Sequence, residues 1–247
     1  MEKKEYQAIY NVEDTHWWYV GLRALVISFV EEFVSRHASP AILDAGCGTG
    51  GMLSALKNHN ACGIDYAEEA LKFCRLRGLT NVQQGSVCDL PYADRLFGIV
   101  ISLDVLYHLE VADDLLALRE LHRVTAPKGM LILNLPAYEF LMSFHDRMNR
   151  TRHRYTLREV RDKVEAAGFS VRRISYRNTF LFPPAAAVRL ARRFIGDGNK
   201  DAESDLRPLP PLLNRMLKNL LLFENGLISR GAHFPFGLSI FCVAERG

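Results

Sequence analysis

The sequence predicts an α/β protein built on a doubly wound, mostly parallel sheet. Apolar runs with strand character alternate with amphipathic helical runs between residues 41 and 178. The first of these strands leads into a glycine-rich loop, "LDAGCGTGG" at 43–51, as the first strand of a nucleotide-binding fold does. A later run, "LFGIVISL", is apolar without alternation, which is typical of a parallel strand covered on both faces.

The elements follow in a regular order. Apolar residues at helical spacing predict a helix over 17–37, ahead of the first strand "PAILDAG". Helix ends are marked by Gly78 after "AEEALKFCRLR", by Pro127 after "ADDLLALRELHRV" and by Thr156 as the N-cap of "TLREVRDKVEAAGF". A further helix is expected in "GGMLSALKNH", and the other strands in "ACGIDY", "NVQQGS", "GMLILNLP", "SVRRISYRN" and "PFGLSIFCVAE".

The chain is expected to form a single domain over 1–247 with two additions. Residues 1–38 form an N-terminal helical cap, and residues 179–234 form a helical insertion between the last two strands. The insertion holds two apolar and basic helices, at about 184–195 and 211–230. It could cap the substrate, touch an anionic membrane surface, form a dimer face or pack onto the sheet.

Composition indicates a cytoplasmic protein, with peripheral membrane contact as an open alternative. Among the 247 residues no apolar run approaches the roughly 20 residues that span a bilayer, and the N-terminus is too polar for a signal peptide. The five cysteines are widely spaced, so neither a disulfide framework nor a metal site is expected. The net charge is +3, but residues 145–195 carry thirteen Arg or Lys against four acidic residues. This basic segment either attracts an anion or is a solvated helix face.

The glycine loop by itself leaves two cofactors open. Gly46-x-Gly48-x-x-Gly51 fits a dinucleotide fingerprint, whereas Asp44-x-Gly46-x-Gly48-x-Gly50 fits the loop of S-adenosylmethionine-dependent methyltransferases. Asp65 follows about 20 residues later, at the end of the second strand, where a carboxylate can accept hydrogen bonds from ribose hydroxyls. Both cofactors contain an adenosine ribose, so Asp65 does not discriminate between them.

The motifs downstream favour S-adenosylmethionine. The segments "AILDAGCGTGG", "GIDYA", "GSVCDLPYAD", "FGIVISLDVLYHL" and "PKGMLILNLPA" occur in the order and spacing of class I (Rossmann-like) S-adenosylmethionine-dependent methyltransferases. The sequence resembles that family over about 15–178 and 236–246. The resemblance implies a seven-stranded sheet with an antiparallel last strand, and a cofactor site formed by Tyr19, Arg23, Asp44, Gly46, Cys47, Gly48, Gly50, Asp65, Tyr66, Ser86, Val87, Leu103 and Asp104.

The third-strand motif departs from the family pattern. Many members have an Asp that accepts a hydrogen bond from the adenine amino group, and Ser86 stands at the equivalent position in "GSVCDLPY". A serine accepts more weakly, and Asp89 could substitute although it lies three residues late. The adenine contact is therefore less well defined than the rest of the cofactor site.

Several residues are candidates for binding or deprotonating the methyl acceptor. His108 lies one helical turn after Asp104, and the loop "FHDRMNRTRHRYTL" after the fifth strand offers further histidines and arginines. The catalytic candidates are His145, His153, His108 and Tyr155. The substrate-binding candidates are Trp18, Tyr107, His108, Asp146, Arg150 and Arg154.

Together these observations predict methyl transfer from S-adenosylmethionine to an oxygen, nitrogen or carbon of a small anionic or amphipathic acceptor. The expected partners are a small-molecule or lipid-linked acceptor and no nucleic acid, because no RNA-binding motif occurs. A monomer or homodimer is expected. Two alternatives stay open: an NAD-dependent oxidoreductase, and a non-catalytic S-adenosylmethionine-binding regulatory protein.

Overall fold

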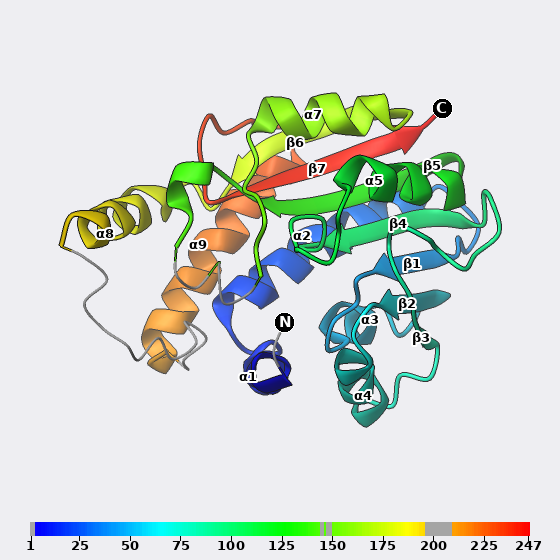
Figure 1. Ribbon diagram of the computed structural model, residues 1–247, viewed down its shortest axis with the longest axis horizontal. Coiled ribbons are helices and arrows are strands. Elements are labelled where there is room, and N and C mark those ends of the chain that lie inside the picture. The colour runs from blue at the N-terminus through cyan, green and yellow to red at the C-terminus, as the bar shows by residue number, and fades with distance from the viewer. Residues whose placement is uncertain (1–2, 144–145, 147–149, 196–208) are drawn as a thin grey trace.

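A seven-stranded sheet with helices on both faces forms the body of the protein (Figure 1). The computed structural model describes residues 3–143, 146, 150–195 and 209–247. The strand order is β3-β2-β1-β4-β5-β7-β6, and β7 runs antiparallel to both β5 and β6. The predicted fold class, including the antiparallel last strand, is confirmed. The strands are β1 (Ile42–Ala45), β2 (Ala61–Asp65), β3 (Val82–Gln84), β4 (Phe97–Leu103), β5 (Thr125–Pro136), β6 (Phe169–Arg177) and β7 (Ser239–Arg246).

Two apolar clusters hold the helices to the sheet. The cluster around Leu43, Val100 and Leu131 packs under α5 (Asp114–Val124) and α7 (Leu157–Ala166). The opposite cluster, around Ile42 and Ile132, packs under α2 (Trp17–Val34) and α9 (Pro211–Ser229). The parallel strands are therefore buried on both faces, which accounts for their continuous apolar runs.

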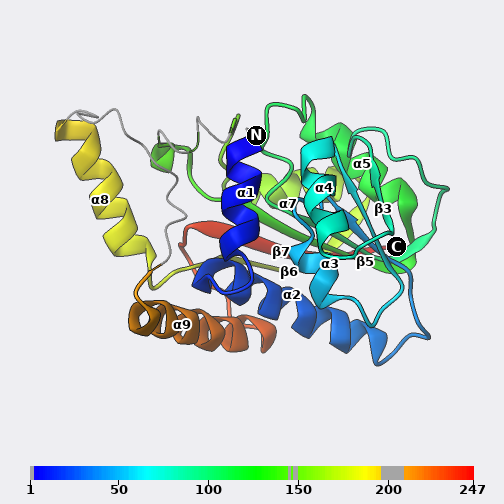
Figure 2. The same cartoon turned by 90° about the horizontal axis from the view of Figure 1, so that it is seen from below.

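The chain before β1 forms two helices, and α3 (Gly51–Ala55) and α4 (Glu68–Leu76) flank β2. The first helix, α1 (Lys3–Val12), lies beside α4 (Figure 2). Tyr10 packs on Phe73 of α4 with ring centroids 5.0 Å apart. Sequence periodicity predicted α2 within a few residues, whereas α1 was included only in the general expectation of a cap over 1–38.

The insertion between β6 and β7 contributes two separate helices. In Figure 2, α9 runs beside α2, while α8 (Phe182–Ile195) projects from the body. Gly21 permits the close contact between α2 and α9, because a Cβ atom there would lie 2.7 Å from Leu221 Cδ1. Asn225 of α9 also donates a hydrogen bond of 2.7 Å to the Gly21 carbonyl. No helix in the described residues is long and apolar enough to cross a membrane.

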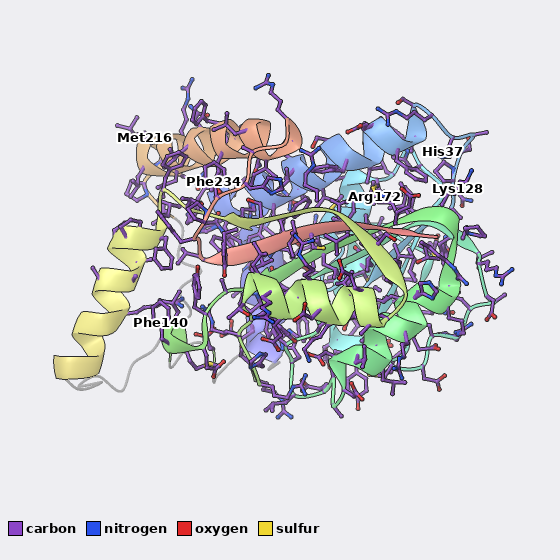
Figure 3. The ribbon with its side chains drawn as sticks, turned by 90° about the horizontal axis from the view of Figure 1, so that it is seen from above. His37, Lys128, Phe140, Arg172, Met216 and Phe234 are labelled. Carbon is purple, nitrogen blue, oxygen red and sulfur yellow. The ribbon has the colours of Figure 1, made fainter. Side chains whose placement is uncertain are left out.

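The predicted site residues gather at one end of the sheet. His37 precedes β1 and Lys128 lies early in β5, and both lie at the end of the molecule far from α8, whereas Phe140, after β5, lies close to α8 (Figure 3). Asp44, Asp65 and Leu103 are at the carboxyl ends of adjacent strands β1, β2 and β4. Ligands of doubly wound sheets bind at this end, where the strand order reverses beside β1.

Candidate active site

A cavity of about 840 Å³ opens at the carboxyl end of the sheet. Its walls come from α1, α2, the glycine loop, the ends of β2 and β4, the segment after β5 and the start of α8. This volume is within the range of small-molecule and cofactor sites. The glycine loop, the end of β4 and the aromatic side chains of Trp17, Trp18, Tyr107 and His108 all line this one cavity; we call the part at the glycine loop its first half and the part at the aromatic side chains its second half.

The glycine loop leaves space that side chains would fill. Gly46 has φ +93°, and a Cβ there would collide with the Val105 side chain. Gly48 also has a positive φ, +53°, but a Cβ there would meet nothing within 4 Å. The Gly48 N–H donates a hydrogen bond of 2.8 Å to Asp65 Oδ2. The backbone is therefore held open at Gly48, where a ligand can approach closely.

Asp44 is a buried acid with an unsatisfied oxygen. Its Oδ2 atom is buried and has no hydrogen-bond partner in the described residues. Burial, reinforced by the charges of Asp65 and Glu13, raises the pKa of Asp44 to about 8. A cationic group in the cavity would satisfy the oxygen and favour the ionised form. The ammonium group of a methionyl moiety fits this requirement.

Asp65 is already fixed by backbone hydrogen bonds. Its Oδ2 accepts from Gly48, and its Oδ1 accepts from the N–H of Ala67 at 2.9 Å. Burial raises the pKa of Asp65 although these two hydrogen bonds lower it. Carboxylate oxygens have further lone pairs, so the same group can also accept from ribose hydroxyls. The donor set around the loop therefore fits S-adenosylmethionine.

A polar network with no local sequence signal holds α1 to this loop. Glu13 is buried directly after α1 and accepts hydrogen bonds from the Thr49 hydroxyl and, at 2.7 Å, from Arg77 Nη2. Arg77 also donates to the Thr49 carbonyl at 2.9 Å and to Asp14 at 2.8 Å. Glu13 is 36 positions from Thr49 and 64 positions from Arg77, beyond the reach of local pattern reasoning.

Aromatic side chains line the second half of the cavity. Trp17 and Trp18, at the start of α2, pack edge to face with centroids 5.5 Å apart. Tyr107 and His108 follow β4, and their rings lie 4.3 Å apart. The first two turns of α8 complete this part of the wall. Such a chamber suits a planar or apolar group, with polar atoms available from the end of β4.

Most predicted site residues line this one cavity. All the predicted cofactor residues line it except Gly50, whose added Cβ would meet Leu79 and Cys74 instead. Ser86 lines the cavity and Asp89 does not. The substrate candidates on its wall are Trp18, Tyr107, His108, Asp146 and Arg154.

The remaining candidates are elsewhere. The Tyr155 hydroxyl is buried and donates to Asp114 at 2.9 Å, and burial raises its pKa above the usual value, so the structure places it in the core. The His153 ring contacts Glu159 at 2.9 Å, and Arg150 pairs with Glu110 at 2.6 Å; neither lines the cavity. His145 lies outside the described residues.

Arg154 lines the cavity but is engaged by protein groups. Its Nε atom donates to Asp146 at 3.1 Å and its Nη1 to the Ala137 carbonyl at 2.8 Å. Burial alone would raise the pKa of Asp146, but Arg154 and the hydrogen bonds from Ser143 outweigh it and lower the pKa. We therefore give Arg154 and Asp146 a structural role, which is to fix the wall of the cavity.

The comparisons with known proteins agree with this geometry. The class of the fold is that of Rossmann-like methyltransferases: a solved structure of a putative sarcosine dimethylglycine methyltransferase from Galdieria sulphuraria superposes with a TM-score of 0.58, at 16% identity, over 92% of this chain and 85% of its own. A chain of the solved "Complex between the Haloferax volcanii Trm112 methyltransferase activator and the putative methyltransferase" gives a TM-score of 0.57, at 19% identity, over 98% of this chain and 93% of its own.

Residues 43–133 match the family model described as a methyltransferase domain. This match covers the glycine loop, Asp65 and the end of β4. Residues 43–133 therefore form a methyltransferase domain, and the sheet around them has the fold of methyltransferases of known structure.

Curated relatives match a little more than half of the chain. "Probable tRNA methyltransferase 9B" of Mus musculus is 29% identical over 144 residues, 56% of this chain and 31% of its own. The "tRNA (carboxymethyluridine(34)-5-O)-methyltransferase" of Arabidopsis thaliana is 30% identical over 142 residues, 56% of this chain and 34% of its own. The aligned segment thus spans about a third of the length of these relatives.

The sequence predicted a small-molecule or lipid-linked acceptor and no nucleic acid. The exclusion of nucleic acid is wrong. It depended on the absence of a separate RNA-binding motif. Relatives whose names give tRNA as the substrate share this domain with the chain, so a nucleic acid acceptor is plausible without such a motif.

Proposed function

We propose that the protein transfers a methyl group from S-adenosylmethionine to a nucleoside of RNA, with tRNA as the first acceptor to test. The observation that carries this proposal is the aromatic chamber of Trp17, Trp18, Tyr107 and His108, which adjoins the glycine-loop half of the same cavity. Unstacked bases of single-stranded RNA are bound by stacking on aromatic side chains. The relatives named as tRNA methyltransferases support the same acceptor class.

Charge also supports an anionic polymer. Residues 145–195 carry a net charge of +9, while the rest of the chain carries −6. Within this segment Arg158 is 92% exposed, and Arg150 and Arg161 are exposed as well. Lys and Arg neutralise RNA phosphates and release counterions, so such binding weakens as salt rises.

The protein's contribution to the reaction is binding, alignment and proton removal. The bound cofactor supplies a methyl group activated by a positively charged sulfur. Asp44, Asp65 and the glycine loop would hold the cofactor at one side of the end of β4, and the aromatic chamber would hold the acceptor at the other. Fixing the two reactants in line supplies about 7–11 kcal/mol of the barrier reduction.

The test is methyl transfer to RNA. Purified protein is incubated with methyl-tritiated S-adenosylmethionine and unmodified tRNA transcripts or total tRNA from a strain lacking the gene. We expect acid-precipitable label that ribonuclease releases, and its loss in Trp18→Ala and Tyr107→Ala variants that still bind S-adenosylhomocysteine. Label appearing only in small molecules of the same extract would contradict the RNA acceptor.

A non-catalytic regulatory protein would behave differently. It would bind S-adenosylhomocysteine and RNA but leave the RNA unlabelled at any enzyme concentration. The matched control is Phe223→Ala, at an aromatic side chain of α9 that is 61% exposed and does not line the cavity. We expect no loss of RNA methylation in this variant.

A further inference from the structure

Asp104 lines the same cavity as the glycine loop and the aromatic side chains. It directly follows β4, and its φ of +58° places it in the left-handed region, which is costly for a residue other than glycine. Two hydrogen bonds to Asn134 of β5, one from the backbone and one to the side chain of Asp104, hold this conformation. The Asp104 N–H donates to the Asn134 carbonyl at 2.9 Å, and the Asn134 side chain donates to Asp104 Oδ1 at 2.9 Å.

The other carboxylate oxygen, Oδ2, differs from Oδ1 in having no protein donor in the part of the chain that the structure describes. Asp104 lines the cavity wall and is only partly buried, and no described residue donates a hydrogen bond to its Oδ2 atom. Leu103 and Val105 line the cavity on either side of it. The hydrogen bond to Oδ1 and the lack of one to Oδ2 from the described residues leave one carboxylate oxygen of this cavity-lining residue available to a ligand.

Four titratable or charged groups face this carboxylate from the surrounding elements. They are Tyr19 of α2, Tyr107 after β4, Arg154 before α7 and Arg177 of β6. Burial raises the pKa of Asp104 to about 6, against the lowering effects of the Asn134 hydrogen bond and the two arginines. Asp104 is therefore ionised at neutral pH and is a much stronger base than an ordinary aspartate.

Arg177 is the unusual member of this set. Its side chain is fully buried, and both terminal nitrogens lack a hydrogen-bond partner in the described residues. Its guanidinium lies 6.0 Å from the centre of the Trp18 ring. Burial lowers the pKa of Arg177 to about 10, so it keeps its charge at neutral pH. A buried cation whose terminal nitrogens are unsatisfied stabilises negative charge nearby.

We infer that Asp104 Oδ2 accepts the proton that the acceptor atom loses, and that the acceptor atom is therefore an N–H nitrogen or an O–H oxygen and not a carboxylate oxygen. The inference rests on the proposed function. In the step, the acceptor's N–H or O–H bond breaks, its proton passes to Oδ2, and a bond forms to the methyl carbon. The electron pair of the carbon–sulfur bond stays on sulfur. A carboxylate acceptor has no proton to lose and would be repelled by Asp104.

Arg177 and Asn134 are positioning residues in this scheme. They do not line the cavity, and they act through the charge and orientation of Asp104. His108 follows the same strand end, lines the cavity and is of a type that titrates near neutral pH, so it provides the competing assignment. The two assignments differ in which substitution removes the acidic limb of the pH–rate profile.

The first test is a direct titration of Asp104. Protein labelled with ¹³C at aspartate carboxyls is titrated by NMR without cofactor. We expect a resonance with a pKa near 6 that is absent in Asp104→Asn and moves to higher pH in Arg177→Met. If Arg177→Met does not fold, Asn134→Ala replaces it, because losing the Asn134 hydrogen bond should also raise the pKa of Asp104. Asp94→Asn, at a side chain 68% exposed, is the matched control. If Asp104 titrates below about pH 4.5, close to the range of ordinary aspartates, the inference is overturned.

The second test uses single-turnover methylation of tRNA and the chemistry of the product. We expect Asp104→Asn, measured at saturating S-adenosylmethionine, to lower the rate by about 10²–10⁴ and to abolish the limb near pH 6. The methyl label should resist mild alkali. Alkali-labile label, a methyl ester, or a limb removed by His108→Gln and retained in Asp104→Asn would overturn the inference. Absence of any tRNA methylation refutes the RNA acceptor alone, and the NMR titration still decides the assignment of Asp104.

Discussion

Arg154 and Asp146 form an ion pair in the cavity wall, with Arg154 Nε 3.1 Å from Asp146 Oδ1. Both side chains are less than 10% exposed. Arg154 also donates to the Ala137 carbonyl, while Ser143 donates to the second oxygen of Asp146. The pair thus joins the chain after β5 to the residues that precede α7, and it gives the acceptor half of the cavity a fixed side.

Removing one member of this pair should be costly. We expect Arg154→Met to lower the free energy of unfolding by about 3 kcal/mol, because Asp146 would keep, among the described residues, only its longer ion pair, at 4.0 Å, with Arg189. The double variant with Asp146→Asn should regain part of this loss. Urea denaturation measures both. Arg158→Met is the control, at a side chain 92% exposed, and should change stability by less than about 0.5 kcal/mol. An equal effect of the two single variants would show that the buried pair has no special role.

The glycine loop permits a matched test of the cofactor site. Gly48 and Gly78 both have positive φ, and an added Cβ meets nothing within 4 Å at either. Gly48→Ala and Gly78→Ala should therefore each lose about 1–2 kcal/mol of stability from backbone strain. Only Gly48 lines the cavity, so only Gly48→Ala should also weaken S-adenosylhomocysteine binding, by at least about tenfold in calorimetry. Equal affinities of the two variants would place the cofactor elsewhere.

Asp44 should couple cofactor binding to proton release. The pKa of Asp44 is about 8 in the folded protein without ligand, well above that of an aspartate in the unfolded chain. The folded state therefore holds this proton more tightly, and the free energy of unfolding falls as pH rises toward 8. A ligand ammonium beside Asp44 favours the ionised form, and affinity should rise with pH between about 6 and 8. Titration of S-adenosylhomocysteine at about pH 7 in phosphate and in Tris should show different heats, reporting a released proton. Identical heats in the two buffers, or an unchanged dependence in Asp44→Asn, would contradict this role.

The exposed arginines near the cavity should affect RNA and not cofactor. Arg150 and Arg152 are exposed or partly exposed, with side-chain exposures of 52% and 32%. We expect Arg150→Gln with Arg152→Gln to raise the KM for tRNA and reduce the salt dependence of binding, since each phosphate that is no longer neutralised lowers the slope by about one. Arg36→Gln, beyond the far end of α2 and 70% exposed, is the control. A loss of S-adenosylhomocysteine affinity in the double variant would instead give these residues a structural role.

The sheet could be predicted well because its signals are local. Apolar runs, Gly78 and Thr156 mark strand and helix ends within a few residues, and Thr156 caps α7 by accepting from the Glu159 N–H at 3.2 Å. The helix α3 is shorter than "GGMLSALKNH" suggested, ending at Ala55. Only one turn of α3 makes apolar contacts with β2 and α4. The sequence contains no local signal that marks the end of the helix at this point.

The cofactor half of the site could also be predicted, since the loop motif and Asp65 are separated by one strand and one helix. The acceptor half could not. His153 and Tyr155 are typical catalytic residue types, but their partners Glu159 and Asp114 are set by tertiary packing. In the sequence Arg177 is one of many basic residues, because its approach to Trp18 joins β6 to α2, which are far apart in the chain. Arg177 differs from the other arginines because it is buried and its terminal nitrogens have no hydrogen-bond partner in the described residues. The sequence does not report burial, so it could not single out Arg177.

The most direct test of the account is a calorimetric comparison of two ligands. S-adenosylhomocysteine and NADH are titrated in turn into the wild-type protein and into Asp65→Ala, with Asp162→Ala on the surface of α7 as control. We predict that S-adenosylhomocysteine binds, that Asp65→Ala weakens it at least about tenfold by removing a charged hydrogen-bond acceptor, and that NADH gives no comparable heat. Binding of NADH with similar affinity, or unchanged S-adenosylhomocysteine affinity in Asp65→Ala, would contradict a methyltransferase site at this cavity.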